Sequence, residues 1–418
     1  MQDQLAAIDD LLIRRDVKKA EVQIAKVLRS ATTPHQRAQV LLFRARARLL
    51  GARPEDALDD ITAARSLDEE VAEPAALLEL LGDSYFARFE LASVGFADRG
   101  DTQRAINAYQ EIVDQHPLYE NIGWIYYQMG RVLLTENRTD EAVTCFRQGL
   151  LNPSRVPALT AYAFERLAFV AFYESRELVK ALGFINKAVD TYPANEDRRW
   201  LVQVHILRSR VLRDMHRLGE ALKAAETALS VAGNNTNNED KLGLAEAMLT
   251  MGELLHPMEG RERDVINYLQ QFLQLSKKPL GVDVTWSRVY EMLGDAFYKT
   301  GQHTAAVNAY QGALQFNPYN PWELSLHYRI ARSYYVQGDY DRSIQALRRM
   351  QEVAHADGQA LNDYRVYDML GNALFALGRY DDAVESYRTA LQMAPPNADN
   401  LDKIRTYHDF ARELSRPL

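Results

Sequence analysis

The sequence predicts an all-α solenoid of about ten antiparallel helical hairpins, closed by a helix near the C-terminus. Apolar residues recur at helical spacing along most of the 418 residues. A small residue in one predicted helix is usually followed about twelve residues later by an alanine or serine in the next. Such pairs recur at intervals of 37 to 48 residues. Because one hairpin cannot bury its apolar face alone, the copies are expected to stack on one another.

The clearest copy lies at residues 367–395, YDMLGNALFALGRYDDAVESYRTALQMAP. Its two helices are expected to cross where Gly371 faces Ala383, because small residues let the backbones approach closely. Leu370 and Tyr387 are placed to fill the space beside that crossing. This pattern resembles the tetratricopeptide repeat, whose signature places an aromatic, Leu-Gly, Ala, a second aromatic, Ala and Pro in this order. The resemblance implies a right-handed α-solenoid that binds other proteins.

The copies can be followed along the whole chain, so a single TPR-like domain is expected over residues 1–418. Residues 1–75 are expected to form two degenerate hairpins, 76–118 a hairpin with lengthened helices, 119–397 seven hairpins, and 398–418 a capping helix. A small residue marks each first helix except the first, where Ile8 takes this place; the others are Ala45, Gly82, Gly130, Ala168, Ser209, Gly252, Gly294, Ala331 and Gly371. The family's usual repeat is about 34 residues. These longer intervals therefore indicate longer helices or turns.

The hairpin at 76–118 contains an insertion. Gly82 and Ala105 are 23 residues apart, about 11 more than usual, which is about three helical turns. The first helix is therefore expected to continue through Phe96 and to project from the stack. Phe86, Phe89 and Phe96 form a second possible partner-binding site if they are exposed. The alternative is that this apolar stripe packs on its own hairpin or on a neighbouring one.

Composition and motifs argue against several functions. The net charge is −8 and the isoelectric point about 5.7, which is unfavourable for binding nucleic acid. No apolar run reaches the ~20 residues that span a bilayer, so no membrane insertion is expected. The single cysteine, Cys145, excludes an internal disulfide and suits the cytoplasm. We find no motif for catalysis, a metal or a phosphate group, so we expect no enzyme activity, no cofactor and no catalytic residues.

The resemblance implies a concave groove lined by the first helices. The residues three before, one after and four after the small residue are expected to face this groove. Aromatic rings and charges of both signs there would suit an extended or helical peptide. The alternative for the aromatics is that they brace the scaffold. The sequence therefore predicts a scaffold or adaptor that binds a protein or peptide; a regulatory sensor of a signal peptide or small ligand is the alternative, and a homo-oligomer is left open. The predicted groove residues are Tyr127, Arg131, Phe169, Phe172, Glu291, Asp295, Tyr298, Tyr328, Arg332, Tyr335, Asp368, Asn372 and Phe375.

Overall fold

The computed structural model describes residues 1–418 except 15, 93–97, 234–240, 357–360 and 417–418. Within the described residues the chain forms 21 α-helices and one short π-helical segment, and no β-strand. Consecutive helices pack in ten pairs, from α1 with α2 to α19 with α20, and α21 follows the last pair. The predicted all-α solenoid is therefore confirmed. The chain divides into two compact units, residues 1–197 and 198–418, and the single domain stays a prediction.

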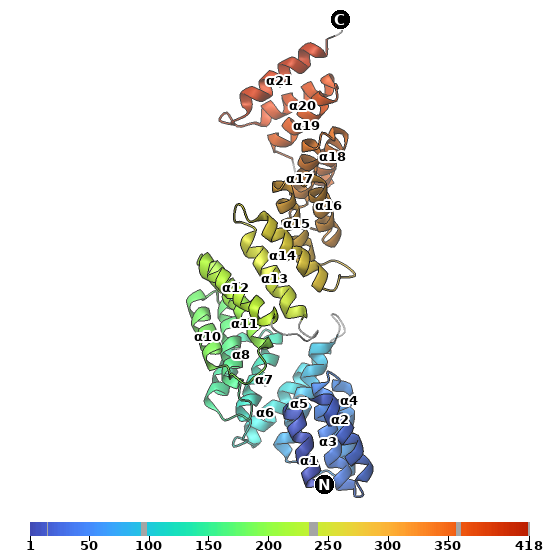
Figure 1. The fold of residues 1–418 in the computed structure, drawn as a ribbon, viewed down its shortest axis with the longest axis vertical. Helices are drawn as coiled ribbons and strands as arrows, with labels where there is room; N and C mark the ends of the chain where they lie inside the picture. Colours follow the sequence, from blue (N-terminus) through green and yellow to red (C-terminus); the bar gives the residue numbers. More distant parts are fainter. Residues whose placement is uncertain (15, 93–97, 234–240, 357–360, 417–418) are drawn as a thin grey trace. The chain divides into compact units, whose positions relative to one another are not determined.

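The first unit contains five helix pairs, coloured blue to green in Figure 1. A π-helical segment interrupts its fifth pair. The elements are α1 (Gln2–Ile13), α2 (Val17–Ser30), α3 (Pro34–Leu50), α4 (Pro54–Leu67), α5 (Pro74–Leu91), α6 (Arg99–Gln115), α7 (Ile122–Thr135), α8 (Thr139–Leu151), α9 (Leu159–Phe169), η1 (Val170–Glu174) and α10 (Leu178–Thr191).

The second unit contains the other five pairs and the last helix, coloured green to red in Figure 1. The elements are α11 (Arg199–Asp214), α12 (Leu218–Gly233), α13 (Lys241–Leu255), α14 (Glu262–Leu275), α15 (Val284–Lys299), α16 (His303–Phe316), α17 (Glu323–Val336), α18 (Tyr340–Ala356), α19 (Tyr364–Ala376), α20 (Tyr380–Met393) and α21 (Leu401–Leu414).

A left-handed residue marks the turn inside most helix pairs. The turns before α16, α18 and α20 contain Gly301, Gly338 and Gly378, with φ of 77°, 77° and 74°. Glycine adopts this conformation without steric cost, which explains why it ends the first helix of these pairs. Other pairs make a comparable turn with a different residue, and these positive-φ residues are Ala52, Asn137, Arg176 and His216.

The hairpin with the insertion is longer than its neighbours but differs from the expectation. α5 has 18 residues and α6 has 17, against 14 in α7. α5 nevertheless ends at Leu91, and Ala92 is extended with ψ of 142°. The helix therefore stops before Phe96, which lies outside the described residues. Arg88 on α5 binds the buried Asp101 on α6 through two hydrogen bonds of 2.7 and 2.5 Å, so an ion pair joins the lengthened ends.

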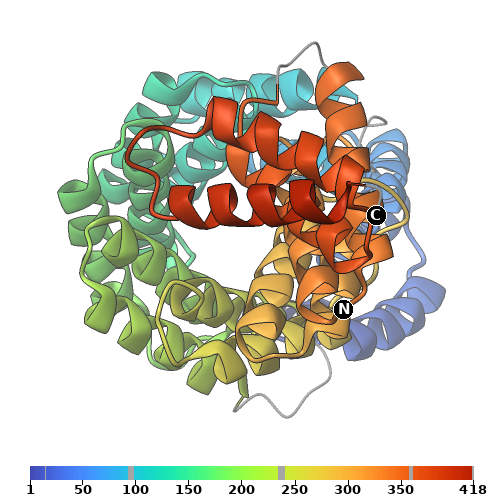
Figure 2. The same ribbon diagram turned by 90° about the horizontal axis from the view of Figure 1, so that it is seen from above.

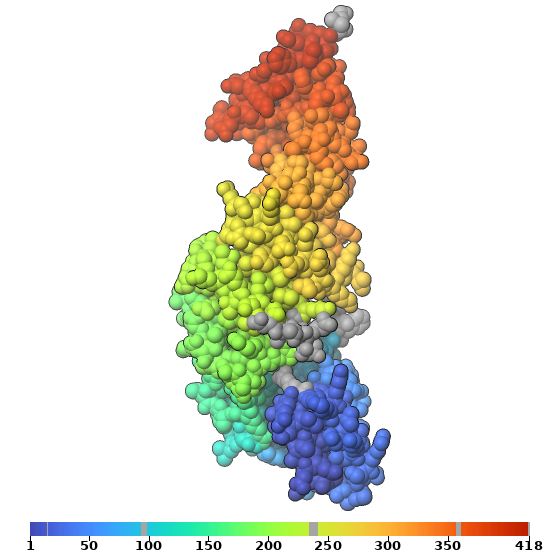
Figure 3. Space-filling view, viewed as in Figure 1, coloured from blue at the N-terminus to red at the C-terminus, as the bar shows by residue number. Residues whose placement is uncertain are grey.

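The last helix covers the end of the second unit. α21 packs on α20, as Figure 2 shows for the two red helices. Ile404 and Ala411 turn inward and are buried, whereas Phe410 on the other face is half exposed. In Figure 3 the residues of α21 form the outer surface of this unit at its C-terminal end. α21 thus buries one face of the final repeat, as a capping helix does.

Candidate functional site

A glycine–aromatic contact fixes the crossing inside four of the helix pairs. A Cβ atom at Gly294 would lie 2.4 Å from the ring of Tyr310 on the paired helix. The corresponding distance is 2.7 Å from Gly371 to the ring of Tyr387. The same contact occurs between Gly82 and Tyr109 and between Gly130 and Phe146. Glycine is needed at these positions because the partner ring occupies the space of a side chain.

Where that ring is a tyrosine, its hydroxyl group binds the residue that follows the glycine. Tyr109 Oη donates to Asp83 Oδ1 at 2.6 Å, and Tyr310 Oη donates to Asp295 Oδ1 at 2.8 Å. Tyr387 Oη donates to Asn372 Oδ1 at 3.0 Å. These three acceptors were expected to face the groove, and the structure shows that each also braces its own hairpin.

Two positions on neighbouring first helices contact each other. One is the fourth residue after the small residue of a repeat, and the other is the first residue after the small residue of the following repeat. Arg131 of α7 lies over the ring of Phe86 of α5, 4.8 Å from its centroid. Arg332 of α17 lies over Tyr298 of α15 in the same way, at 4.6 Å. His256 Nε2, which follows α13, lies 3.3 Å from an oxygen of Asp295 on α15. Neighbouring first helices are thus joined through side chains that were predicted from the sequence to line the groove.

Glu291 and Asp295 are held mainly by the scaffold. Arg329 Nη1 donates to Glu291 at 3.0 Å and to Asp295 at 3.0 Å. Burial raises the pKa of Asp295, but the hydrogen bond to His256 and the charge of Arg329 outweigh burial and hold this pKa below its usual range. Both carboxylates are therefore paired with Arg329 of the same unit.

A cavity of about 360 Å³ lies on the first helices of the last two repeats, against the start of α21. We call it the C-terminal pocket. Three tyrosines, two carboxylates and two amides dominate its lining. It contains four of the predicted groove residues, which the structure therefore brings together. The lining residues are Tyr328, Tyr335, Tyr364, Arg365, Asp368, Met369, Asn372, Asp399 and Asn400.

Asp368 is the central acidic group of the C-terminal pocket. Asn372 Nδ2 donates to Asp368 Oδ1 at 2.9 Å, and Asn400 Nδ2 donates to Asp368 Oδ2 at 2.7 Å. Burial raises the pKa of Asp368, while the two amides and the charge of Lys403 oppose this only in part. Unlike Asp295, Asp368 receives these two hydrogen bonds from neutral groups.

The other predicted groove residues are placed differently. Tyr127 and Phe172 are buried, with 8% and 2% of their surface exposed, so neither offers a ring to a partner. Phe172 turns inward within η1, and this π-helical turn could not be anticipated from the spacing. Phe169 is partly exposed with Arg166 5.0 Å from its ring centroid. Phe375 packs edge-on against Tyr407 of α21, with ring centroids 5.6 Å apart.

The second partner site predicted near the insertion is not supported by burial. Phe86 is 1% exposed and lies beneath Arg131. Phe89 is partly buried against the core of the first unit. The third residue of that prediction, Phe96, lies outside the described residues. Phe86 therefore belongs to the core, which corrects its assignment as an exposed binding residue.

The positional rule places Glu79 and Asp83 of α5 at the groove, although neither was among the predicted binding residues. Tyr119 Oη and Asn121 Nδ2 donate to Glu79 at 2.5 and 2.7 Å, and Gln128 Nε2 donates to Asp83 at 3.0 Å. Burial and the neighbouring charge of Asp83 raise the pKa of Glu79 to about 7. The signal was present, because acidic residues also stand three before and one after Gly294.

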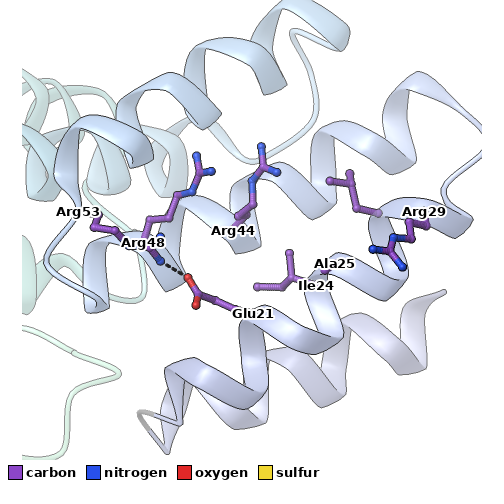
Figure 4. Close-up of a pocket in the computed structure, with 8 residues that line it drawn as sticks. Glu21, Ile24, Ala25, Arg29, Arg44, Arg48 and Arg53 are labelled. Atoms are coloured by element: carbon purple, nitrogen blue, oxygen red, sulfur yellow. Dashed lines mark hydrogen bonds and ion pairs between the residues drawn. The ribbon is translucent and has the colours of Figure 1, made fainter.

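A second cavity, of about 320 Å³, lies between α2 and α3 and is shown in Figure 4. Arg44 and Arg48 both bind Asp60, at 2.5 and 2.8 Å, and Asp60 is only 2% exposed. Arg53 pairs with Glu21. Carboxylates of the same unit thus pair with three of the four arginines that line the cavity, so we assign these ion pairs to the joining of α2, α3 and α4. The lining residues are Glu21, Ile24, Ala25, Leu28, Arg29, Arg44, Arg48 and Arg53.

Three further features bear on possible functions. Among the residues that the structure describes, no group of three or more His, Cys, Asp and Glu side chains could hold a metal ion. No helix in the described parts of the chain is long and apolar enough to cross a membrane. Cys145 is buried, and burial raises the pKa of its thiol to about 11, so it carries no thiolate at neutral pH.

Sequence comparison finds tetratricopeptide-repeat models matching residues 77–119, 118–151, 287–320 and 322–396. A small glutamine-rich tetratricopeptide repeat-containing protein 2 from Mycosarcoma maydis is 28% identical over 119 residues, 28% of this chain and 31% of that protein. A CTR9 homolog from Arabidopsis thaliana is 22% identical over 330 residues, 79% of this chain and 28% of that protein. This chain thus spans less than a third of either relative.

Among solved structures, the apo form of the quorum sensor NprR from B. thuringiensis has a similar fold. It superposes with a TM-score of 0.52 at 13% sequence identity. The alignment covers 75% of this chain and 86% of that one. At this identity the likeness concerns the fold alone.

Proposed function

Because this chain belongs to the tetratricopeptide-repeat family, we propose that it is a non-catalytic, cytoplasmic scaffold or adaptor that binds a protein or peptide on its first helices. The observation that supports this most is the C-terminal pocket. It places Tyr328, Tyr335, Asp368 and Asn372 around one cavity, and all four were expected to face a partner. Aromatic side chains in such a position are typical anchors for a peptide.

The pocket offers both parts of a peptide-binding surface. Tyr328 and Tyr335 provide apolar ring faces, and neither is fully buried. Asp368 and Asn372 provide polar groups beside the rings. Apolar anchors give affinity and the polar groups fix the register of a bound chain. A single side chain of a partner would fit within the cavity of about 360 Å³.

The direct test is affinity capture from a lysate of the source organism with the immobilised full chain. We expect the double variant Tyr328→Ala with Tyr335→Ala to keep its helicity and lose the main captured protein. Truncation of such anchors typically costs about 2 kcal/mol or more, which weakens binding about thirtyfold. Tyr319→Ala is the matched control, because Tyr319 is 88% exposed and lies outside the pocket. A partner that binds the double variant as well as the wild type would refute this location.

The alternative is a regulatory sensor, in which the ligand of the pocket changes the arrangement of the repeats. The cavity volume of about 360 Å³ favours keeping this alternative, because it falls in the range of small-ligand pockets, roughly 300–1,000 Å³. Small-angle scattering of the full chain with and without a bound peptide separates the two functions. A scaffold keeps its radius of gyration, whereas a sensor of this kind changes it.

A further inference from the structure

Two repeats show what normally covers a groove aromatic in this chain. The ring of Phe86 carries Arg131 from the next first helix at 4.8 Å, and the ring of Tyr298 carries Arg332 at 4.6 Å. In both cases the ring stands four residues after the small residue of its repeat, and the arginine stands one residue after the small residue of the following repeat. A guanidinium group is attracted to the electron-rich face of an aromatic ring. The scaffold therefore uses an arginine to cover these rings.

The next repeat keeps the ring but lacks the arginine. Tyr335 stands four residues after Ala331, and the residue after Gly371 is Asn372. Asparagine is too short to lie over the ring of the preceding repeat, and its carbonyl oxygen already accepts the hydroxyl hydrogen of Tyr387. Tyr335 and Asn372 both line the C-terminal pocket. The cavity is thus lined by the two positions, one aromatic and one in the following repeat, that an arginine–ring contact joins in the other two cases.

The charges around the pocket favour a cation. Asp368 and Asp399 both line it. Arg365 also lines it, but is bound to Asp363 through contacts of 2.7 and 2.9 Å, and the charge of Lys403 also acts on Asp368. Asn400 donates to Asp368. The lining therefore combines carboxylates and amides with tyrosine rings. An acidic or phosphorylated side chain would meet the two carboxylates and gain little from an arginine that is already paired.

Resting on the proposed function, we propose that the C-terminal pocket binds a basic side chain of the partner, an arginine in preference to a lysine. Its guanidinium group takes over Tyr335 the place that Arg332 takes over Tyr298. The planar group can stack on a tyrosine and at the same time donate hydrogen bonds to carboxylate and amide oxygens in its plane. Lysine offers a point charge without the stacking plane.

The test begins with a phage library of random linear dodecapeptides, selected on the immobilised full chain. Enriched peptides are expected to share an arginine at one position; a shared lysine in its place would overturn the preference for arginine. A selected peptide is then synthesised with that residue or with its neutral counterpart, citrulline for arginine or acetyllysine for lysine. Fluorescence anisotropy is expected to show at least tenfold weaker binding of the neutral peptide, because a charge-assisted hydrogen bond is lost. Asp368→Asn in the protein should weaken binding of the basic peptide to a similar extent.

Asn372→Arg supplies the internal arginine that the other repeats have and should abolish binding of the basic peptide. Gln311→Arg is its matched control, since it adds the same charge at an exposed position on α16, outside the pocket. Thermal melts of both variants establish that they are folded.

The outcomes separate this inference from the proposed function. If Tyr335→Ala abolishes binding but the neutral peptide and Asn372→Arg bind like the wild type, the pocket is a peptide site and the inference about a cation is wrong. If selected peptides bind Tyr335→Ala unchanged, or if no sequence is enriched, both the inference and the proposed function are overturned.

Discussion

Replacing Gly294 with alanine tests the packing at the centre of a repeat. The new Cβ atom would lie 2.4 and 2.5 Å from two ring atoms of Tyr310, distances that real Cβ contacts do not show. Tyr310 is 2% exposed and its hydroxyl is bound to Asp295, so the ring cannot move aside without losing other contacts. The two helices must separate or the ring must shift, and overpacking of this kind costs about 1–3 kcal/mol.

A matched substitution separates this clash from the intrinsic effect of alanine in a helix. Gly219 lies in the first turn of α12 in the same unit, and nothing lies within 4 Å of the place where its Cβ would be. Gly219→Ala should therefore leave the free energy of unfolding unchanged or raise it by up to about 1 kcal/mol. Gly294→Ala should lower it, so the two variants should differ by roughly 1–4 kcal/mol.

The assay is guanidinium unfolding followed by far-ultraviolet circular dichroism, with amide hydrogen exchange to locate the effect. Because repeats contact mainly their neighbours, faster exchange should concentrate in α15 and α16 and decline along the stack. A Gly294→Ala variant as stable as Gly219→Ala would show that the ring relaxes at little cost. The reasoning about the helix crossing would then be wrong.

Three other predictions follow from buried polar groups. Because the pKa of Glu79 is raised from 4.5 to about 7, the folded state binds more protons than the unfolded state between these pH values. The free energy of unfolding should therefore fall by up to about 3 kcal/mol as pH rises from 4.5 to 7. Denaturant titrations of Glu79→Gln should show a weaker dependence of stability on pH, and the same dependence as in the wild type would contradict the assignment. Tyr109→Phe should lower the free energy of unfolding by about 1–3 kcal/mol and by more than Tyr310→Phe. Without the Tyr109 hydroxyl, Asp83 keeps the neutral donors of Gln128 and Trp124, whereas Asp295, the acceptor of Tyr310, keeps Arg329. Equal losses in thermal melts would argue against this. The Cys145 thiol should not react with a disulfide reagent at pH 8 until the chain is denatured, and rapid labelling of the native protein would show that it is accessible.

The hairpins could be predicted because the constraint that creates them is local. A glycine such as Gly371 and an aromatic such as Tyr387 lie within one hairpin, and their close approach leaves a fixed spacing in the sequence. The end of α5 could not be predicted in this way. Apolar spacing continues past Leu91, but the helix ends there. Hydrophobic period alone does not determine the residue at which a helix ends.

The candidate site was only partly predictable, because the sequence gives the positions of side chains but not their partners. Asp295 and Asn372 occupy the same place in their repeats, yet Asp295 binds Arg329 and His256 whereas Asn372 lines a cavity. The difference arises in the neighbouring repeat, about 40 residues away. Contacts between repeats decide which predicted groove residue is available to a partner, and Phe172 shows that a π-helical turn can remove one altogether.

The same contacts explain why one aromatic position of the second unit stands apart from its neighbours. Tyr298 is covered by Arg332 of the next repeat. Phe375, in the last repeat, has no further hairpin to supply an arginine, and α21 provides Tyr407 against its edge instead. Tyr335 lies between these two and meets Asn372, which cannot extend over its ring. In this unit the chain's own side chains cover the rings of Tyr298 and Phe375, and a cavity remains at Tyr335, where an asparagine stands in place of the arginine. This difference can be recognised in the sequence once it is known that the residue after the small residue covers the ring of the preceding repeat.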